Sequence, residues 1–120
     1  MENIGISVVA TKVKDILVVT LPNDLSNENF DQLKTKVVSG LSSSEVKAVV
    51  FECSALQYID RYEFIDLKHL LDSSRILGAK PYLVSLSPGI IKYLIESDVD
   101  LSGIKAFLSL NEALDFLEIN

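Results

Sequence analysis

The sequence of 120 residues is poor in the side chains that most enzymes use for chemistry. One cysteine excludes an internal disulfide, and one cysteine with one histidine supplies too few ligands for the usual metal sites. The five glycines are scattered, and none belongs to a glycine-rich phosphate-binding loop. We therefore expect no enzymatic activity, no metal and no cofactor.

Positive charge and long apolar runs are scarce as well. Eleven lysines and arginines stand against 17 acidic residues, and the resulting net charge of −6 argues against a nucleic-acid-binding surface and against docking on anionic lipid. No apolar run approaches the roughly 18 residues of a membrane span, and the first residues do not resemble a signal peptide. The single cysteine fits a reducing compartment. We expect a cytoplasmic protein that neither binds nucleic acid nor inserts into a membrane.

What the sequence does contain is a regular alternation of strand-like and helix-like segments over one domain, residues 1–120. Two β-branched runs, Ile4 to Ala10 and Ile16 to Leu21, flank a polar turn from Thr11 to Lys14 and predict a β-hairpin. Later strands are predicted by the continuous apolar run at 48–51, by a second central segment at 82–86 and by a short apolar piece at 106–108. A continuous run of this kind is typical of a strand that is buried on both faces.

Four segments repeat apolar residues at the three- and four-residue spacing of a helix face. They begin after Ser26, near Arg61, after Ser87-Pro88 and after Ser109; the first should end near Gly40, before a polar loop at 42–45. Their predicted buried faces are Phe30, Leu33, Val37 and Leu41; Phe64, Leu67, Leu70, Leu71 and Ile76; Ile90, Ile91, Leu94 and Ile95; and Ala113, Leu114 and Leu117. The sequence thus predicts an α/β fold in which a mixed four- to five-stranded sheet, with an N-terminal β-hairpin, carries about four helices.

The stretch from Leu56 to Phe64 joins an apolar strand to the helix predicted over about 61–77. Asp60 is placed as the N-cap of this helix, and Glu63 three residues later completes the spacing of a capping box. Gly78 stands where a helix C-cap favours a residue with positive φ. The single histidine, His69, is interpreted as a surface residue of the helix, and Cys53 as a small buried apolar residue.

Four segments together resemble the STAS domain, the fold of bacterial anti-sigma factor antagonists, and in particular the stressosome scaffold and co-antagonist branch. The segments are 52–60 (ECSALQYID), 75–80 (RILGAK), 87–90 (SPGI) and 98–104 (DVDLSGI). The resemblance covers nearly the whole chain. It implies the α/β fold predicted above and a regulatory role through protein–protein contacts.

The resemblance also implies which residue should carry a regulatory phosphate. The family loop reads Ile or Val, then Asp, then a Ser or Thr that accepts phosphate from a partner kinase. Ile59 and Asp60 match, but the acceptor position falls on Arg61, which has no hydroxyl and carries a charge opposite to that of phosphoserine. A second acceptor, present in some relatives, would fall near Tyr93. The resemblance therefore implies a degenerate phosphoacceptor position at Arg61.

The function that follows is a non-enzymatic regulatory module that binds a kinase-like anti-sigma factor or other STAS subunits, and a homo-oligomer is among the assemblies that this role allows. The implied partner-binding residues are Tyr58, Asp60, Arg61, Tyr62 and Glu63. Arg61 is either a solvated residue paired with Asp60 or Glu63, or a contact to an acidic partner surface. Two alternatives stay open: a cytoplasmic accessory subunit of a membrane transporter, and a domain that senses a small molecule or nucleotide near the same loop.

Overall fold

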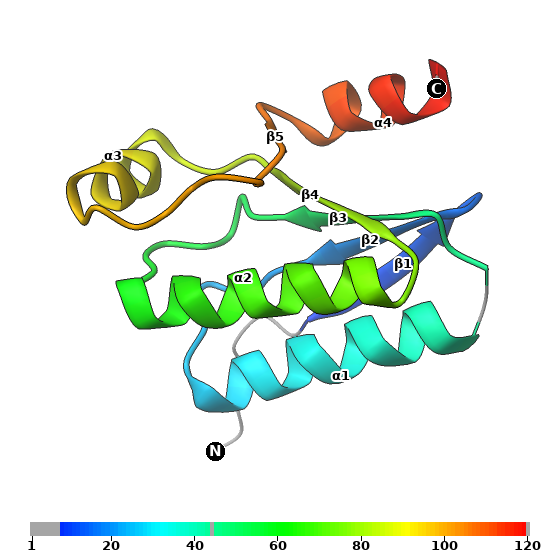
Figure 1. Ribbon diagram of the computed structural model, residues 1–120, viewed down its shortest axis with the longest axis horizontal. Coiled ribbons are helices and arrows are strands. Elements are labelled where there is room, and N and C mark those ends of the chain that lie inside the picture. Colours follow the sequence, from blue (N-terminus) through cyan, green and yellow to red (C-terminus); the bar gives the residue numbers. More distant parts are fainter. Residues whose placement is uncertain (1–7, 44, 120) are drawn as a thin grey trace.

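The computed structural model describes residues 8–43 and 45–119, and within them a five-stranded sheet has the order β1-β2-β3-β4-β5 (Figure 1). The strands are β1 (Val9–Val13), β2 (Ile16–Thr20), β3 (Ala48–Glu52), β4 (Lys80–Val84) and β5 (Ala106–Phe107). The β1–β2 pair is antiparallel and the other three pairs are parallel. The predicted mixed sheet with an N-terminal hairpin is therefore confirmed.

Four helices lie around this sheet: α1 (Asn27–Ser43), α2 (Arg61–Ile76), α3 (Pro88–Glu96) and α4 (Leu110–Ile119). Helices α1 and α2 pack side by side on one face, and α4 covers part of the other face (Figure 1). Because consecutive parallel strands are joined by crossovers of one hand, α1 and α2 fall on the same side. Helix α3 lies beyond the carboxyl end of β4, away from the sheet faces (Figure 1).

The central strands bury both of their faces, as their continuous apolar runs predict. Alternate residues such as Leu17, Phe51 and Leu83 belong to the core beneath α1 and α2. Their neighbours Val50 and Tyr82 belong to a second, smaller core beneath α4. Each fully buried large apolar side chain stabilises the fold by roughly 1.5–3 kcal/mol relative to an exposed one.

The predicted strand boundaries need two corrections. Residues 11–13, predicted as a turn, continue β1, and the chain reverses at Lys14 and Asp15, where Lys14 has φ of 56°. Strand β4 begins at Lys80 and ends at Val84, earlier than predicted, because Ser85 adopts φ of 65° and leaves the extended conformation. The predicted start of the first strand at Ile4 lies outside the described residues.

Helix α1 passes Gly40, where its end was predicted, and includes the first two residues of the predicted serine loop. The reason for a glycine at position 40 is close packing. A Cβ added there would lie 2.7 Å from Cδ2 of Leu17 on β2. Gly40 therefore lets the helix approach the sheet and does not end it.

The predicted apolar faces are confirmed where a helix lies over the sheet and are wrong beyond its edges. The residues predicted to be buried on α1 and α2 are buried or packed on the core, except Ile76, which is 85% exposed in the last turn of α2. On α3, Ile90 and Leu94 are buried, but Ile91 and Ile95 are 39% and 62% exposed, because α3 has the core on one side only. None of the helices in the described ranges is long and apolar enough to cross a membrane.

Candidate partner-binding site

The segment from Cys53 to Asp60 connects the carboxyl end of β3 to α2 and is held on both sides. The N–H of Cys53 donates to the carbonyl of Val84 at 2.9 Å, and the N–H of Gln57 donates to the carbonyl of Asn23 at 2.9 Å. These bonds tie the loop to β4 on one side and to the segment that follows β2 on the other. The loop is therefore a fixed part of the carboxyl edge of the sheet.

Two apolar anchors decide which loop residues face outward. Leu56 and Ile59 are 3% and 4% exposed and belong to the main core. Between them, Tyr58 is 58% exposed, although tyrosine contributes large apolar contact area when it is covered by a partner. The anchors therefore hold Tyr58 outward at a defined position.

The start of α2 is fixed by the predicted capping box, which the structure confirms. The N–H of Glu63 donates to Oδ1 of Asp60 at 2.8 Å, and the N–H of Asp60 donates to Oε1 of Glu63 at 3.0 Å. Two backbone donors that a helix start leaves unpaired are thus satisfied reciprocally. Asp60 and Glu63 hold the frame on which the first turn of α2 presents its other side chains.

Arg61 and Tyr62 are the outward residues of that first turn. Tyr62 is 73% exposed, and Arg61 is exposed as well. Within residues 8–43 and 45–119, the guanidinium of Arg61 forms no ion pair and no hydrogen bond. The alternative in which Arg61 pairs with Asp60 or Glu63 is therefore not found among the described residues.

The loop does not stand alone, because α3 lies beside it. A small open pocket of about 260 Å³ lies between the loop and α3, where Gly89, Ile90 and Tyr93 line it. Helix α3 begins as predicted, with Ser87 as N-cap accepting from the N–H of Ile90 at 3.2 Å, and with Pro88 in its first turn. The sequence placed Tyr93 near a second acceptor site, but it did not predict that α3 adjoins the loop.

Comparison with known families decides what this arrangement is. A sequence model described as the STAS domain matches residues 7–113. The chain belongs to the STAS domain family.

Solved structures agree with this assignment. A serine-to-glutamate variant of RsbS from Moorella thermoacetica is 26% identical, covers 93% of this STAS domain and is itself covered to 95%, with a TM-score of 0.77. A chain from a structure of the stressosome, described as a signal integration and transduction hub, is 25% identical, with coverage of 92% and 96% and a TM-score of 0.73.

One further match is a membrane protein. The murine anion transporter Slc26a9 is 17% identical and matches with a TM-score of 0.72, covering 92% of this chain but only 19% of its own. At this identity the match shows the shared fold alone. Comparison with curated proteins found no matching sequence.

The chemistry around the loop of this STAS domain agrees with a binding surface more than with a reactive one. Burial raises the pKa of the Cys53 thiol to about 12, and the neighbouring carboxylate of Glu52 adds to this effect. Cys53 is fully buried, as predicted, and stays a neutral thiol at neutral pH, so it offers no nucleophile. His69 is exposed on α2, and the described residues contain no group of three or more potential metal ligands.

Glu52 at the end of β3 is stabilised in its charged form. Partial burial would raise its pKa, but hydrogen bonds from the Ser54 and Ser85 side chains and from the Ser54 backbone together outweigh burial and lower it. Oγ of Ser54 donates to Oε1 of Glu52 at 2.6 Å. Ser85, whose positive φ ends β4, therefore contributes to a polar cluster that joins β3 to β4 beside the loop.

Proposed function

We propose that this STAS domain is a non-enzymatic regulatory module that binds a partner protein through the loop and the first turn of α2. The contacting residues are Tyr58, Asp60, Arg61, Tyr62 and Glu63. The observation that carries the proposal is an anchored loop and a capped helix start that turn aromatic and charged side chains outward, on a family fold that relatives use in regulation. Tyrosine and arginine are the residue types most enriched at the energetic centres of protein interfaces.

The partner we propose is a kinase-like anti-sigma factor or another STAS subunit. The match to RsbS and to the stressosome chain supports this choice. Because the net charge is −6, most of the surface would repel an acidic partner. Arg61 would then be a local positive contact on an otherwise acidic domain. We also propose that a second copy of the chain can serve as such a STAS subunit.

The proposal includes the loss of the phosphate switch at position 61. The family resemblance puts Arg61 at the position of the serine or threonine acceptor, and the capping box around Arg61 is intact. A phosphate at this place would meet the unpaired N–H groups of the helix start, which tolerate negative charge. An arginine there keeps one charge state, so binding would not be switched by phosphorylation at this residue.

The decisive experiment is a phosphorylation assay with radiolabelled ATP and a kinase-like anti-sigma factor from the same genome. We expect no incorporation into the native chain and incorporation into the Arg61→Ser variant. Lys36→Ser on α1 is the matched control, since it also replaces an exposed cation with serine but lies away from the loop. Incorporation into the native chain at any serine refutes the unswitched form of the proposal.

Binding itself is tested by isothermal titration calorimetry with the same partner. Truncation of Tyr62 to alanine should weaken binding by about 1–3 kcal/mol if the residue is covered in the complex. Ile76→Ala is the control, because Ile76 is also highly exposed on α2 but lies at its other end. Equal affinities for the native chain and the Tyr62 variant would place the interface elsewhere.

The transporter alternative rests on the Slc26a9 match, in which a STAS region is a small part of a membrane protein. It predicts co-purification of the native chain with a transporter from solubilised membranes. The nucleotide alternative is not favoured by the loop, since the pocket beside it has a volume of only about 260 Å³ and no lysine or arginine among its lining residues.

A further inference from the structure

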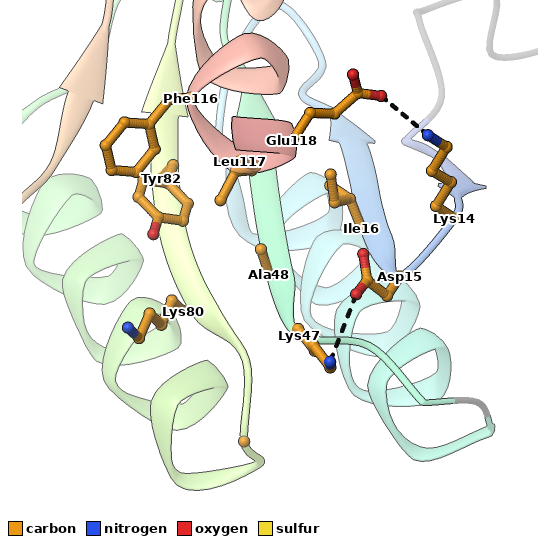
Figure 2. A pocket seen from close by; sticks show the side chains of 11 residues that line it. Lys14, Asp15, Ile16, Lys47, Ala48, Lys80, Tyr82, Phe116, Leu117 and Glu118 are labelled. Atoms are coloured by element: carbon orange, nitrogen blue, oxygen red, sulfur yellow. Dashed lines mark hydrogen bonds and ion pairs between the residues drawn. The ribbon is translucent and has the colours of Figure 1, made fainter. Parts of the chain in front are cut away.

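A larger cleft lies at the opposite edge of the sheet from the partner-binding site. The first residues of three neighbouring strands, Ile16, Ala48 and Lys80, are in register there and form a row across the sheet. The carboxyl-terminal end of α4 overhangs this row, and Leu117 points down toward it (Figure 2). The space between has a volume of about 810 Å³. Ala48 has a small side chain between the larger side chains of Ile16 and Lys80, so the cleft is deepest at this position.

Three lysines surround the cleft, and they differ in their partners. The Nζ of Lys14 lies 3.1 Å from Oε2 of Glu118, and the Nζ of Lys47 lies 3.9 Å from Oδ2 of Asp15 (Figure 2). The ammonium group of Lys80 has no ion-pair partner in the part of the chain that the structure describes. The cleft therefore holds one uncompensated positive charge, on the side formed by β4.

A tyrosine with a buried ring adds a second hydrogen-bond donor on the same side. Tyr82 is 7% exposed, and its ring packs against Phe107 and Phe116, with centroids 5.9 and 6.1 Å away. Its hydroxyl points out of this aromatic cluster toward the Lys80 side of the cleft (Figure 2). That hydroxyl has no hydrogen-bond partner among the described residues, and because these residues contain no buried side-chain oxygen or nitrogen without a partner, it reaches the solvent in the cleft. A tyrosine hydroxyl that reaches solvent from a buried ring can donate to an acceptor that enters the cleft from outside the chain.

We propose that this cleft binds a small amphipathic anion. Its apolar body would lie on Ile16, Ala48 and Leu117, and its one carboxylate, sulfonate or phosphate group would lie between the ammonium group of Lys80 and the hydroxyl of Tyr82. The carboxyl-terminal end of α4 and the carboxylate of Glu118 favour positive charge, so they keep the anionic group on the β4 side. This ligand site is separate from the partner-binding loop and does not depend on the proposed function.

The test uses two fluorescent probes that share one ring system. The first is 8-anilinonaphthalene-1-sulfonate, which is anionic, and the second is N-phenyl-1-naphthylamine, which lacks the sulfonate. We expect saturable binding of both, with tighter binding of the sulfonate. Raising the salt concentration should weaken binding of the sulfonate alone, because salt screens its attraction to the exposed ammonium group of Lys80. Equal affinities of both probes at all salt concentrations would overturn the proposal.

Matched lysine variants locate the bound sulfonate. Lys80→Met should weaken its binding about five- to tenfold and change binding of the uncharged probe less than twofold. Lys92→Met is the control, because Lys92 borders an apolar groove on α3 with Ile91, Ile95 and Leu108, where such a dye could also bind. The proposal predicts no change for Lys92→Met. A loss with Lys92→Met and none with Lys80→Met would assign the dye to α3 and overturn it.

Two further variants separate the ligand site from a general effect on folding. Tyr82→Phe removes only the hydroxyl and should weaken binding of the sulfonate a few-fold while the thermal midpoint stays near that of the native chain. Ala48→Leu should fill the floor and abolish binding of both probes, with circular dichroism used to verify that it folds. If it does not fold, amide chemical-shift mapping on the native chain decides: shifts around Ala48, Lys80 and Leu117 support the site, and shifts confined to α3 refute it.

Discussion

Replacing Asp60 by alanine should destabilise the domain by about 1 kcal/mol, within a general range of roughly 0.5–2 kcal/mol for N-cap substitutions. The substitution removes the 2.8 Å hydrogen bond from the N–H of Glu63 and leaves the 3.0 Å bond from the N–H of residue 60 to Glu63 in place. One of the two reciprocal bonds is therefore lost. Asp60 is solvent-exposed, so water can hydrate the freed N–H, and this keeps the cost below that of a buried unpaired donor.

The measurement is urea denaturation followed by circular dichroism, together with thermal unfolding. For a domain of 120 residues, a loss of about 1 kcal/mol corresponds to a fall of the thermal midpoint of about 4 °C. Asp60→Asn is the first control, because asparagine caps a helix about as well as aspartate. Asp66→Ala is the second, because it removes an exposed carboxylate from the interior of the same helix without touching a cap.

The reasoning is refuted by either of two results. If Asp60→Ala unfolds at the same urea concentration as the native chain, the capping box does not stabilise α2 in solution. If Asp60→Asn loses as much stability as Asp60→Ala, the effect comes from the charge of Asp60 and not from its cap. An Asp60→Ala variant that retains its fold but loses partner binding would show, in addition, that binding needs Asp60, either as a direct contact or through the cap.

Three other predictions follow from burial and charge. Cys53 should resist thiol reagents at pH 8 in the native chain and react fully in denaturant, because burial raises its pKa to about 12; rapid native labelling would contradict this. The pKa of Glu52 is lowered in the folded chain, so its contribution to stability is present above its ordinary value near 4.5 and is lost as pH falls through the folded value. Glu52→Gln should therefore reduce the urea midpoint at pH 7 more than at pH 3. Leu70→Ala should cost about 2–5 kcal/mol, whereas Ile76→Ala should stay within about 0.5 kcal/mol, because the two side chains are 3% and 85% exposed; equal urea midpoints would contradict the assigned faces of α2.

The parts of the fold that the sequence predicted well are those that depend on a few neighbouring residues. The capping box of Asp60 and Glu63, the cap at Ser87 and the positive φ of 97° at Gly78 each need only local spacing and the known preference of one residue type. The mixed sheet was also predictable, because buried strands alternate with amphipathic helices after a hairpin. The family resemblance then indicated which loop to inspect.

The features that the sequence did not predict depend on packing against segments that are distant in the chain. The spacing on α3 gives an apolar side but not how wide a strip the core covers, so Ile91 and Ile95 were wrongly predicted to be buried. Gly40 looked like the end of a helix because the contact that explains it, with Leu17, comes from a distant strand. The cleft near Lys80 depends on the register of three strands and on the last turn of α4, which no local pattern reveals.

The distinction between features set by neighbouring residues and features set by other segments also applies to Arg61. A cation in the first turn of a helix is unfavourable by about 0.3–1 kcal/mol in general. The nearby carboxylates of Asp60 and Glu63 form the capping box, and neither pairs with Arg61 among the described residues. Within the described residues, therefore, no interaction of the Arg61 side chain stabilises the fold. Serine at the same position would leave both hydrogen bonds of the box in place, since they involve only Asp60 and Glu63. Arg61→Ser should thus remove a positive charge and add a hydroxyl at the surface without loss of stability. Any change in partner binding or phosphorylation can then be assigned to residue 61 itself.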